Sequence, residues 1–190
     1  MRTADVVVIG AGAAGMMCAA VAGGRGRRVL LIDHSARIGE KIRISGGGRC
    51  NFTNLFSGPD NFLSANPHFC RSALARYTPR HFLDLVQRHR VPWHEKHRGQ
   101  LFCDESAEQI IELLRRECDA GGVDWLVGTT VERVTHEQGR FVLQTSHGRT
   151  DAGALVVSTG GLSIPKTGAT DFGYRIARQF GLPVVAPRPA

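Results

Sequence analysis

The sequence predicts an α/β fold built on a parallel β-sheet, and three observations support it. Two short runs of β-branched and aliphatic residues, 6–9 and 29–32, have the continuous apolar character of strands buried on both faces. Between them lie a glycine-rich turn and a helix of small residues, so the segment forms a β-α-β unit with parallel strands. A third apolar run, 154–157, also ends in a glycine turn. One sheet with repeated strand–turn–helix units explains all three observations.

The turn after the first strand has the GxGxxG spacing, in Gly10-Ala11-Gly12-Ala13-Ala14-Gly15. In such a unit the first glycine permits the tight turn, the second lets a diphosphate approach, and the third lets the helix pack on the strand. The expected helix, 16–24, offers unpaired N–H groups to phosphates at its start. Asp33 ends the second strand, 18 residues after Gly15, where it is suited to ribose hydroxyls and disfavours the 2′-phosphate of NADP. A turn without ligand is the alternative, but the full context favours dinucleotide binding.

A second glycine cluster follows where a typical dehydrogenase continues with a helix and a third strand. The chain runs through Lys41 into Ser45-Gly46-Gly47-Gly48-Arg49-Cys50-Asn51. Successive glycine N–H groups can bind an anion, and bare backbone leaves room for a flat ring. Arg49 is suited to a phosphate or a substrate carboxylate, and Asn51 to the polar edge of a ring. The cluster therefore indicates a loop that lies against a ligand.

The middle of the chain predicts helices and short strands. Two helices are expected within 66–90, the second beginning at Pro79, with Phe82, Leu85 and Val86 toward the core and Arg80, Arg88 and Arg90 outward. A capping box at 106–109 predicts a helix that ends near 121–122, with apolar side chains at Ile110, Ile111, Leu113 and Leu114. Strands are expected at 91–94, 100–103, 123–127, 130–135, 141–144 and 154–157, and a helix at 172–180 that Gly181 ends.

Composition and charge limit the class of protein. The chain has 190 residues, 42% of them hydrophobic, which is enough for a buried core. Its formal net charge is +7, and residues 71–98 hold seven Lys or Arg against two acids. Such a bias suits a phosphorylated or nucleic-acid partner, or simply a basic surface.

The patterns of cysteine, histidine and hydropathy argue against a disulfide framework, a membrane span, a signal peptide and a metal site. Five cysteines without a CxxC pair indicate free thiols and a cytoplasmic protein. Residues 6–24 are uncharged, but their glycine spacing and the preceding Asp5 argue against a membrane span or signal peptide. The histidines between 68 and 97 lack zinc-ligand spacing, so no metal is expected.

Three motifs together resemble a known family: DVVVIGAGAAG, SGGGRCNFTN and VVSTGGLSIPKTGATDFGYRIA. They resemble the aminoacetone-oxidase-like bacterial flavoproteins, within the glutathione-reductase-like group with two dinucleotide-binding domains. The resemblance implies a Rossmann-like FAD-binding domain with a parallel sheet, a small antiparallel β-hairpin layer and a helical insertion at about 60–90. Since family members have about twice this length, we expect an N-terminal fragment, with an incomplete FAD domain at 1–183 and the start of a link at 184–190.

The resemblance also implies which residues contact FAD. The residues implied to contact the diphosphate are Gly10, Gly12, Ala13, Ala14 and Gly15. Asp33 is implied to contact the ribose, and Lys41 and residues 45–51 are implied to contact the flavin half. Val131 is implied at the adenine edge, with ordinary strand packing as the alternative. Thr159, Gly160 and Gly161 are implied near the cofactor, with a plain turn as the alternative.

The function expected from this resemblance is that of an FAD-dependent oxidoreductase. Its flavin would exchange a hydride with a small organic substrate, with NAD(P)H as a candidate electron donor, and both an amine oxidase and an enoyl-type reductase fit. No catalytic acid, base or nucleophile can be assigned, and Cys50 lacks a nearby cysteine for redox exchange. The alternative is a flavin-containing RNA-associated or binding module with structural FAD, supported only by the basic region 71–98. The sequence disfavours nucleic acid as a partner because no aromatic platform or reading helix is evident beside these charges.

Overall fold

A computed structural model describes residues 1–162, 164 and 168–187 of the chain. The chain forms two compact units. Unit 1 comprises Met1–Glu40 and Leu114–Ala190, and unit 2 comprises Lys41–Leu113. Of the expected link at 184–190, residues 188–190 lie outside the described part.

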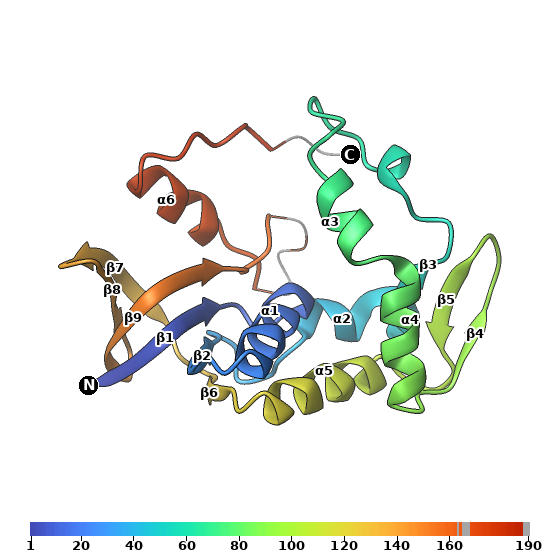
Figure 1. Ribbon diagram of the computed structural model, residues 1–190, viewed down its shortest axis with the longest axis horizontal. Helices are drawn as coiled ribbons and strands as arrows, with labels where there is room; N and C mark the ends of the chain where they lie inside the picture. The colour runs from blue at the N-terminus through green and yellow to red at the C-terminus, as the bar shows by residue number, and fades with distance from the viewer. Residues whose placement is uncertain (163, 165–167, 188–190) are drawn as a thin grey trace. The chain divides into compact units, whose positions relative to one another are not determined.

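Unit 1 is built on a six-stranded mixed sheet in the order β6-β2-β1-β9-β8-β7 (Figure 1). Its strands are β1 (Arg2–Ile9), β2 (Val29–Ile32), β6 (Asp124–Leu126), β7 (Val131–Glu137), β8 (Arg140–Thr145) and β9 (Gly148–Val157). Strands β6, β2, β1 and β9 are parallel, whereas β8 and β7 are antiparallel additions. The β7–β8 hairpin extends the main sheet because β9 is ten residues long and pairs with both β1 and β8.

Helices cover both faces of this sheet (Figure 1). Alternate residues of β1 point to opposite faces, and Val7 and Ile9 belong to a buried cluster with Leu30 and Leu143. Helix α6 (Phe172–Gln179) packs against that cluster through Phe172 and Ile176. Helix α1 (Ala13–Gly24) lies on the other face and buries small residues and Met16. It begins three residues earlier than the sequence predicts, directly after the glycine turn.

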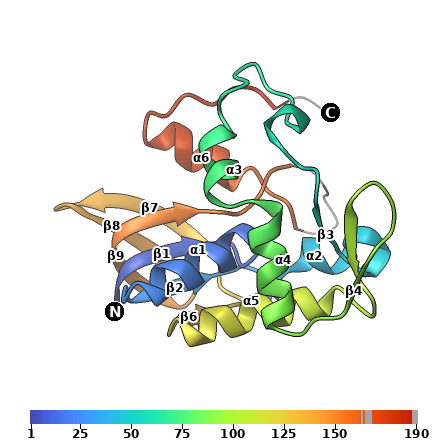
Figure 2. The same ribbon diagram turned by 45° about the vertical axis from the view of Figure 1, so that its right-hand side comes forward.

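Unit 2 contains a separate antiparallel sheet in the order β3-β5-β4 (Figure 2). Its elements are α2 (Glu40–Ile44, which starts at the last residue of unit 1), η1 (Ser45–Gly48), β3 (Asn51–Asn54), η2 (Pro59–Asn61), α3 (Arg71–Arg76), α4 (Pro79–Arg88), β4 (Trp93–Glu95) and β5 (Gln100–Cys103). Helix α5 (Glu108–Ala120) runs from unit 2 into unit 1. The sequence predicts no strand at β3, since Asn-Phe-Thr-Asn lacks strand alternation and becomes extended only by pairing with β5.

The helices of the middle region follow the predicted pattern with one difference. Thr78 caps α4 by accepting a hydrogen bond from the His81 N–H, and Pro79 opens the helix. Leu85 and Val86 are buried as predicted, but the third buried side chain is that of Leu83. Phe82 is only half-buried and packs against Phe52, with ring centroids 6.0 Å apart. The guanidinium-bearing residues expected to face outward, Arg80, Arg88 and Arg90, are exposed, and the four predicted apolar residues of α5 are buried.

No helix among the described residues is long and apolar enough to cross a membrane.

Candidate functional site

The parallel strands of unit 1 end together at one edge of the sheet. Ile9 of β1 is level with Ile32 of β2 and with Val157 of β9, and Ile32 is level with Leu126 of β6. The chain leaves β1 for β2 on one side, whereas β9 lies on the other side, so the connections diverge at the end of β1. Open α/β sheets bind ligands at such a divergence, outside the carboxyl ends of the strands.

Two glycines of the first turn are required by the chain's own packing. Gly10 has φ +107°, and a Cβ there would lie 2.5 Å from the Ser158 carbonyl oxygen. A Cβ on Gly15 would lie 1.8 Å from the Gly10 carbonyl oxygen and 2.6 Å from Ser158 Oγ. Ser158, which the sequence did not single out, donates from Oγ to the Ile9 and Gly10 carbonyl oxygens at 2.9 and 3.1 Å. A polar residue at the end of an apolar strand is the signal that identifies it.

Gly12 differs from both neighbours in the motif. Its backbone is extended at φ −85°, which any residue adopts, and nothing lies within 4 Å of the position of a Cβ. It precedes α1 without a side-chain cap, and the next residues, Ala13 and Ala14, are exposed. The fold itself therefore gives no reason for glycine here. An open cradle at a helix N-terminus fits a diphosphate, which would occupy the space of a side chain.

Asp33 has a structural role that the sequence did not reveal. Its Oδ2 accepts a hydrogen bond from the Ala11 N–H at 2.6 Å, and its Oδ1 accepts one from the Ser35 N–H at 2.8 Å. The carboxylate thus ties the end of β2 to the glycine turn after β1. His34 Nδ1 also lies 3.5 Å from Oδ1. A carboxylate has about four lone-pair sites, so the second site on Oδ2 remains for a ribose hydroxyl. The side chain is only partly buried, with 14% of its surface exposed.

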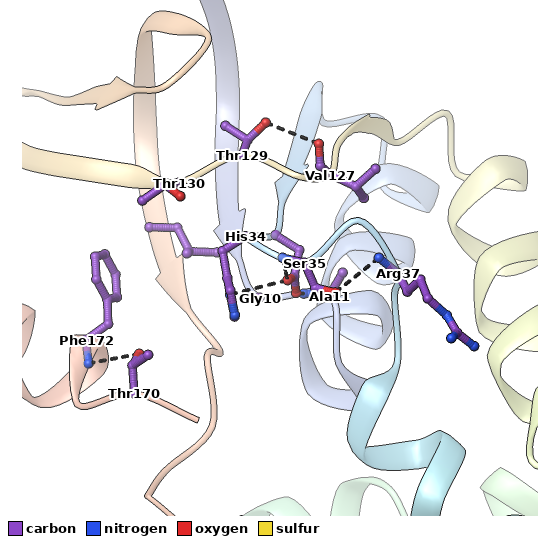
Figure 3. A network of polar contacts seen from close by, with 12 residues as sticks. Gly10, Ala11, His34, Ser35, Arg37, Val127, Thr129, Thr130, Thr170 and Phe172 are labelled. Carbon is purple, nitrogen blue, oxygen red and sulfur yellow. Dashed lines mark hydrogen bonds and ion pairs between the residues drawn. The ribbon is translucent and has the colours of Figure 1, made fainter. Parts of the chain in front are cut away.

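The segment before β7 returns to the same edge. The Thr129 N–H donates to the Asp33 carbonyl oxygen at 2.8 Å, and the Gly128 N–H donates to the Ser35 carbonyl oxygen at 2.9 Å. Figure 3 shows Gly10 and Ala11 close to Ser35, with Thr129 on the adjacent segment. Val131 follows as the first residue of β7. The structure therefore brings together three of the expected contact regions: the glycine turn, Asp33 and the start of β7.

The turn after β9 lies at this edge as well. Thr159 follows Ser158, and its Oγ1 is buried without a hydrogen-bond partner among the described residues. Gly160 has φ +75°, and a Cβ on Gly161 would lie 2.7 Å from the hydroxyl oxygen of Tyr174. A side chain at position 161 would therefore have to displace the Tyr174 hydroxyl group. Residues 163 and 165–167 of the same sequence motif lie outside the described part.

The glycine run of unit 2 forms a tight left-handed turn. Gly46, Gly47 and Gly48 have φ values of +57°, +66° and +85°. A Cβ on Gly46 would lie 2.6 Å from the Asn51 nitrogen and 2.9 Å from the Phe102 ring, so the chain itself fills that space. This corrects the expectation that a ligand alone explains the run. A Cβ added to Gly47 or Gly48 would meet no atom within 4 Å. Lys41 and Arg49, which lie close to this run in the sequence, are exposed.

A family model described as "HI0933-like protein Rossmann domain" matches residues 4–187. The chain belongs to this family. The assignment confirms the resemblance seen in the three sequence motifs and the predicted Rossmann-like fold.

Two relatives of this HI0933-like chain bear the same name, ribosomal RNA dihydrouridine synthase. The protein from Escherichia coli (strain K12) is 53% identical over 188 residues, which is 99% of this chain and 47% of the relative. The protein from Haemophilus influenzae (strain ATCC 51907 / DSM 11121 / KW20 / Rd) is 52% identical over 186 residues, 96% of this chain and 46% of the relative. The HI0933-like chain therefore spans about half the length of these relatives.

A solved structure shares the fold. The open conformation of a flavocytochrome c3 fumarate reductase superposes with a TM-score of 0.62 at 20% identity, covering 94% of this chain and 40% of that one. At this identity the likeness concerns the fold alone.

Cys50 of the HI0933-like chain is a buried thiol. Burial raises its pKa, and burial together with Cys50 raises the pKa of Cys103 to about 12. The two cysteines are close because β3 and β5 pair at Asn51 and Phe102, one residue away from each. All five cysteines are free thiols. A raised pKa keeps both groups protonated, which favours packing over redox exchange.

No group of three or more His, Cys, Asp or Glu side chains within the described part of the chain is arranged to hold a metal ion.

Proposed function

We propose that the intact protein containing this chain is an FAD-dependent enzyme that reduces uridine in ribosomal RNA to dihydrouridine. The 53% identity over 99% of the chain with the E. coli protein of that name carries the proposal. Membership of a Rossmann-domain family and the open cradle at Gly12 support a dinucleotide cofactor. The proposal replaces the small organic substrate expected from the sequence by RNA.

We assign cofactor contacts to the residues that the sequence suggested. The N–H groups at the start of α1, from Ala13 to Gly15, face the diphosphate, and Gly12 leaves room for it. The lone pair of Asp33 Oδ2 that the chain leaves unused accepts a hydrogen bond from a ribose hydroxyl, and Val131 lies toward the adenine. Residues 159–161, together with Lys41 and residues 45–51 of unit 2, are assigned to the remainder of the cofactor.

The chemistry that FAD supplies when bound and reduced is a hydride for one carbon of the uracil C=C bond, while a proton completes the other. Reduction of that C=C bond to a single bond would take two electrons from the reduced cofactor, and NAD(P)H would be the donor that restores it. No residue of this chain is assigned as the proton donor. The described elements bind and orient the cofactor, and we expect the enzyme to act in the cytoplasm.

The basic charge of the chain suits a polyanionic substrate. The formal net charge is +7, and Arg80, Arg88 and Arg90 are exposed around α4. Basic side chains that neutralise phosphates supply affinity without sequence selectivity. The alternative, a module in which FAD is only structural, predicts RNA binding without any reduction of uridine.

A matched pair of glycines tests the cofactor assignment. Gly12 and Gly58 each precede a helix with extended backbone, φ −85° and −144°, and neither has an atom within 4 Å of a Cβ. In the intact protein, Gly12→Val should lose most of the bound FAD because its side chain takes the space of the diphosphate. Gly58→Val should keep the flavin absorbance of the wild type. The readout is the flavin-to-protein absorbance ratio after gel filtration.

The activity test uses ribosomal RNA that lacks dihydrouridine. The wild-type protein with NADH or NADPH should form dihydrouridine, detected by mass spectrometry of nucleosides, and Gly12→Val should form little. A flavin-loaded wild-type protein that binds this RNA but never reduces it would contradict the proposed function and favour structural FAD.

A further inference from the structure

An exposed aromatic ring in unit 2 has no role in the fold's core. Phe56 leaves 73% of its surface exposed. One edge of the ring nevertheless rests on Gly99, because a Cβ there would lie 2.7 Å from Phe56 Cδ2 and 2.9 Å from Cε2. Gly99 has φ +76° in the turn between β4 and β5. The ring is therefore supported from the hairpin and open on its remaining surface.

Hydrogen bonds fix the backbone under this ring. The Asn54 side chain accepts from the Phe56 N–H at 2.8 Å and donates to the Arg98 carbonyl oxygen at 2.9 Å. The Leu55 N–H donates to the Gly99 carbonyl oxygen at 2.9 Å. One asparagine thus joins the segment after β3 to the hairpin tip. A ring on a pre-organised backbone loses little entropy when a second ring stacks on it.

The hairpin tip beside the ring is basic. Lys96, His97 and Arg98 are consecutive and exposed. The neighbouring acid, Glu95, accepts a hydrogen bond from the Gly99 N–H at 2.9 Å, which directs that carboxylate into the turn. An open aromatic face next to exposed cations is the combination that binds single-stranded nucleic acid, because a base stacks while phosphates meet the charges.

We propose that Phe56 and the tip residues Lys96–Arg98 form a contact site for single-stranded RNA. This proposal rests on the proposed function, and it supplies the aromatic platform that the sequence did not reveal. A nucleobase stacks on Phe56, and Arg98 contacts the adjoining phosphate. The site reads no base identity, because stacking and phosphate contact are sequence-tolerant.

The surface continues along the chain from Phe56. No residue from 56 to 77 is buried, and Arg71 and Arg76 are exposed on α3. The same segment exposes further large apolar side chains, those of Phe62, Leu63, Phe69 and Tyr77. The Cys70 Sγ lies 3.9 Å from the Pro59 carbonyl oxygen, which closes the segment into a loop. Rings and cations are adjacent at the C-terminal end of this segment, where Phe69 and Tyr77 flank Arg71 and Arg76. Exposed rings beside cations favour a polyanion over an apolar protein partner.

Fluorescence anisotropy with a labelled oligouridylate tests the proposal in the intact, flavin-loaded protein. Phe56→Ala should weaken binding about 5- to 150-fold, the equivalent of about 1 to 3 kcal/mol per stacked base. Phe56→Tyr keeps the ring and should bind like the wild type. Arg98→Asn suits the left-handed backbone at φ +51° and removes the charge. It should reduce the slope of log K against log salt by about 0.7, the value for one phosphate contact of a single strand.

Controls separate the possible failures. Arg27→Asn removes an exposed charge of unit 1 and should change neither affinity nor slope. Wild-type affinity in both Phe56→Ala and Arg98→Asn would overturn the proposal. So would a fall in melting temperature and flavin content of Phe56→Ala without RNA, since the ring would then pack against the remainder of the protein. Dihydrouridine formation by the wild type is scored separately, so failure of the enzyme activity leaves the binding comparison interpretable.

Discussion

Individual residues of one motif have different physical reasons for being glycine. Glycine is required at Gly10 and Gly15, because a Cβ there would lie 2.5 and 1.8 Å, respectively, from a neighbouring carbonyl oxygen. Gly12 has neither a left-handed backbone nor a neighbour. The motif is therefore part scaffold and part ligand cradle, and only the Gly12 position tests ligand binding without disturbing the fold.

The carboxylate of Asp5 is held by Arg28. It accepts three hydrogen bonds from Arg28, at 2.9, 3.3 and 2.7 Å, which join β1 to the start of β2. These bonds lower the pKa of Asp5 from 3.8 to about 2. A lowered carboxyl pKa stabilises the fold fully above the unfolded-state pKa of 3.8, and this stabilisation is lost as pH falls through the folded-state pKa of about 2. Asp5→Asn should therefore lower the melting temperature at pH 7, with the difference shrinking as pH falls from about 4 to 2 in calorimetric scans.

The reciprocal variant checks the origin of this effect. Arg28→Gln should reproduce the pH profile of Asp5→Asn, and the double variant should add little to either. A melting-temperature difference that persists unchanged at pH 2 would show that Asp5 acts through packing instead of charge.

Helix α1 shows how one element is positioned by the absence of side chains. Gly23 lies against the end of α5, where a Cβ would be 2.3 Å from the Gly121 carbonyl oxygen. The adjacent Gly24 has open space around it and no left-handed backbone. The sequence displays two consecutive glycines at the end of a helix, but only one of them is a packing requirement.

Alanine at these two positions should have opposite effects. Gly23→Ala should lower the free energy of unfolding by about 1–3 kcal/mol, because backbone atoms must move apart. Gly24→Ala should raise it by up to about 1 kcal/mol, since alanine loses less backbone entropy in a helix. Urea denaturation monitored by circular dichroism measures both. Equal destabilisation by the two variants would be incompatible with the close approach at Gly121.

At the scale of the whole molecule, the chain divides between a unit with the dinucleotide turn and a unit with the second glycine cluster. The assignment of residues 45–51 to the cofactor rests on the sequence motifs. Gly47 and Gly122 provide a matched comparison, with φ values of +66° and +65°, exposed positions and open space around each.

Alanine imposes the same backbone strain at both glycines. Gly47→Ala should therefore weaken FAD binding in the intact protein beyond any effect of Gly122→Ala, which reports strain alone. Titration of the apoprotein with FAD, followed by flavin fluorescence, gives the two dissociation constants. Indistinguishable constants for the two variants would remove residues 45–51 from the cofactor site.

Much of the fold was predictable because its signals are local. Apolar runs identified β1, β2 and β9, and the hairpin turn at Gln138 and Gly139 adopts the left-handed backbone that such turns need. Strand β3 was not predictable, since its polar residues become extended only through pairing with β5. The prediction placed Phe82, not Leu83, in the core of α4. It was wrong because Phe82 packs against Phe52, which lies 30 residues away in the sequence.

The sequence by itself determined the β-α-β unit, the glycine turn and the family, because each depends on residues close together in the chain. Tertiary structure alone decided which glycines are scaffold, that Asp33 anchors the turn through Ala11, and that Phe56 lies on Gly99. These contacts join residues 22 and 43 positions apart. Spacing along a chain carries no information about such distances, which are set only when strands pair and turns close.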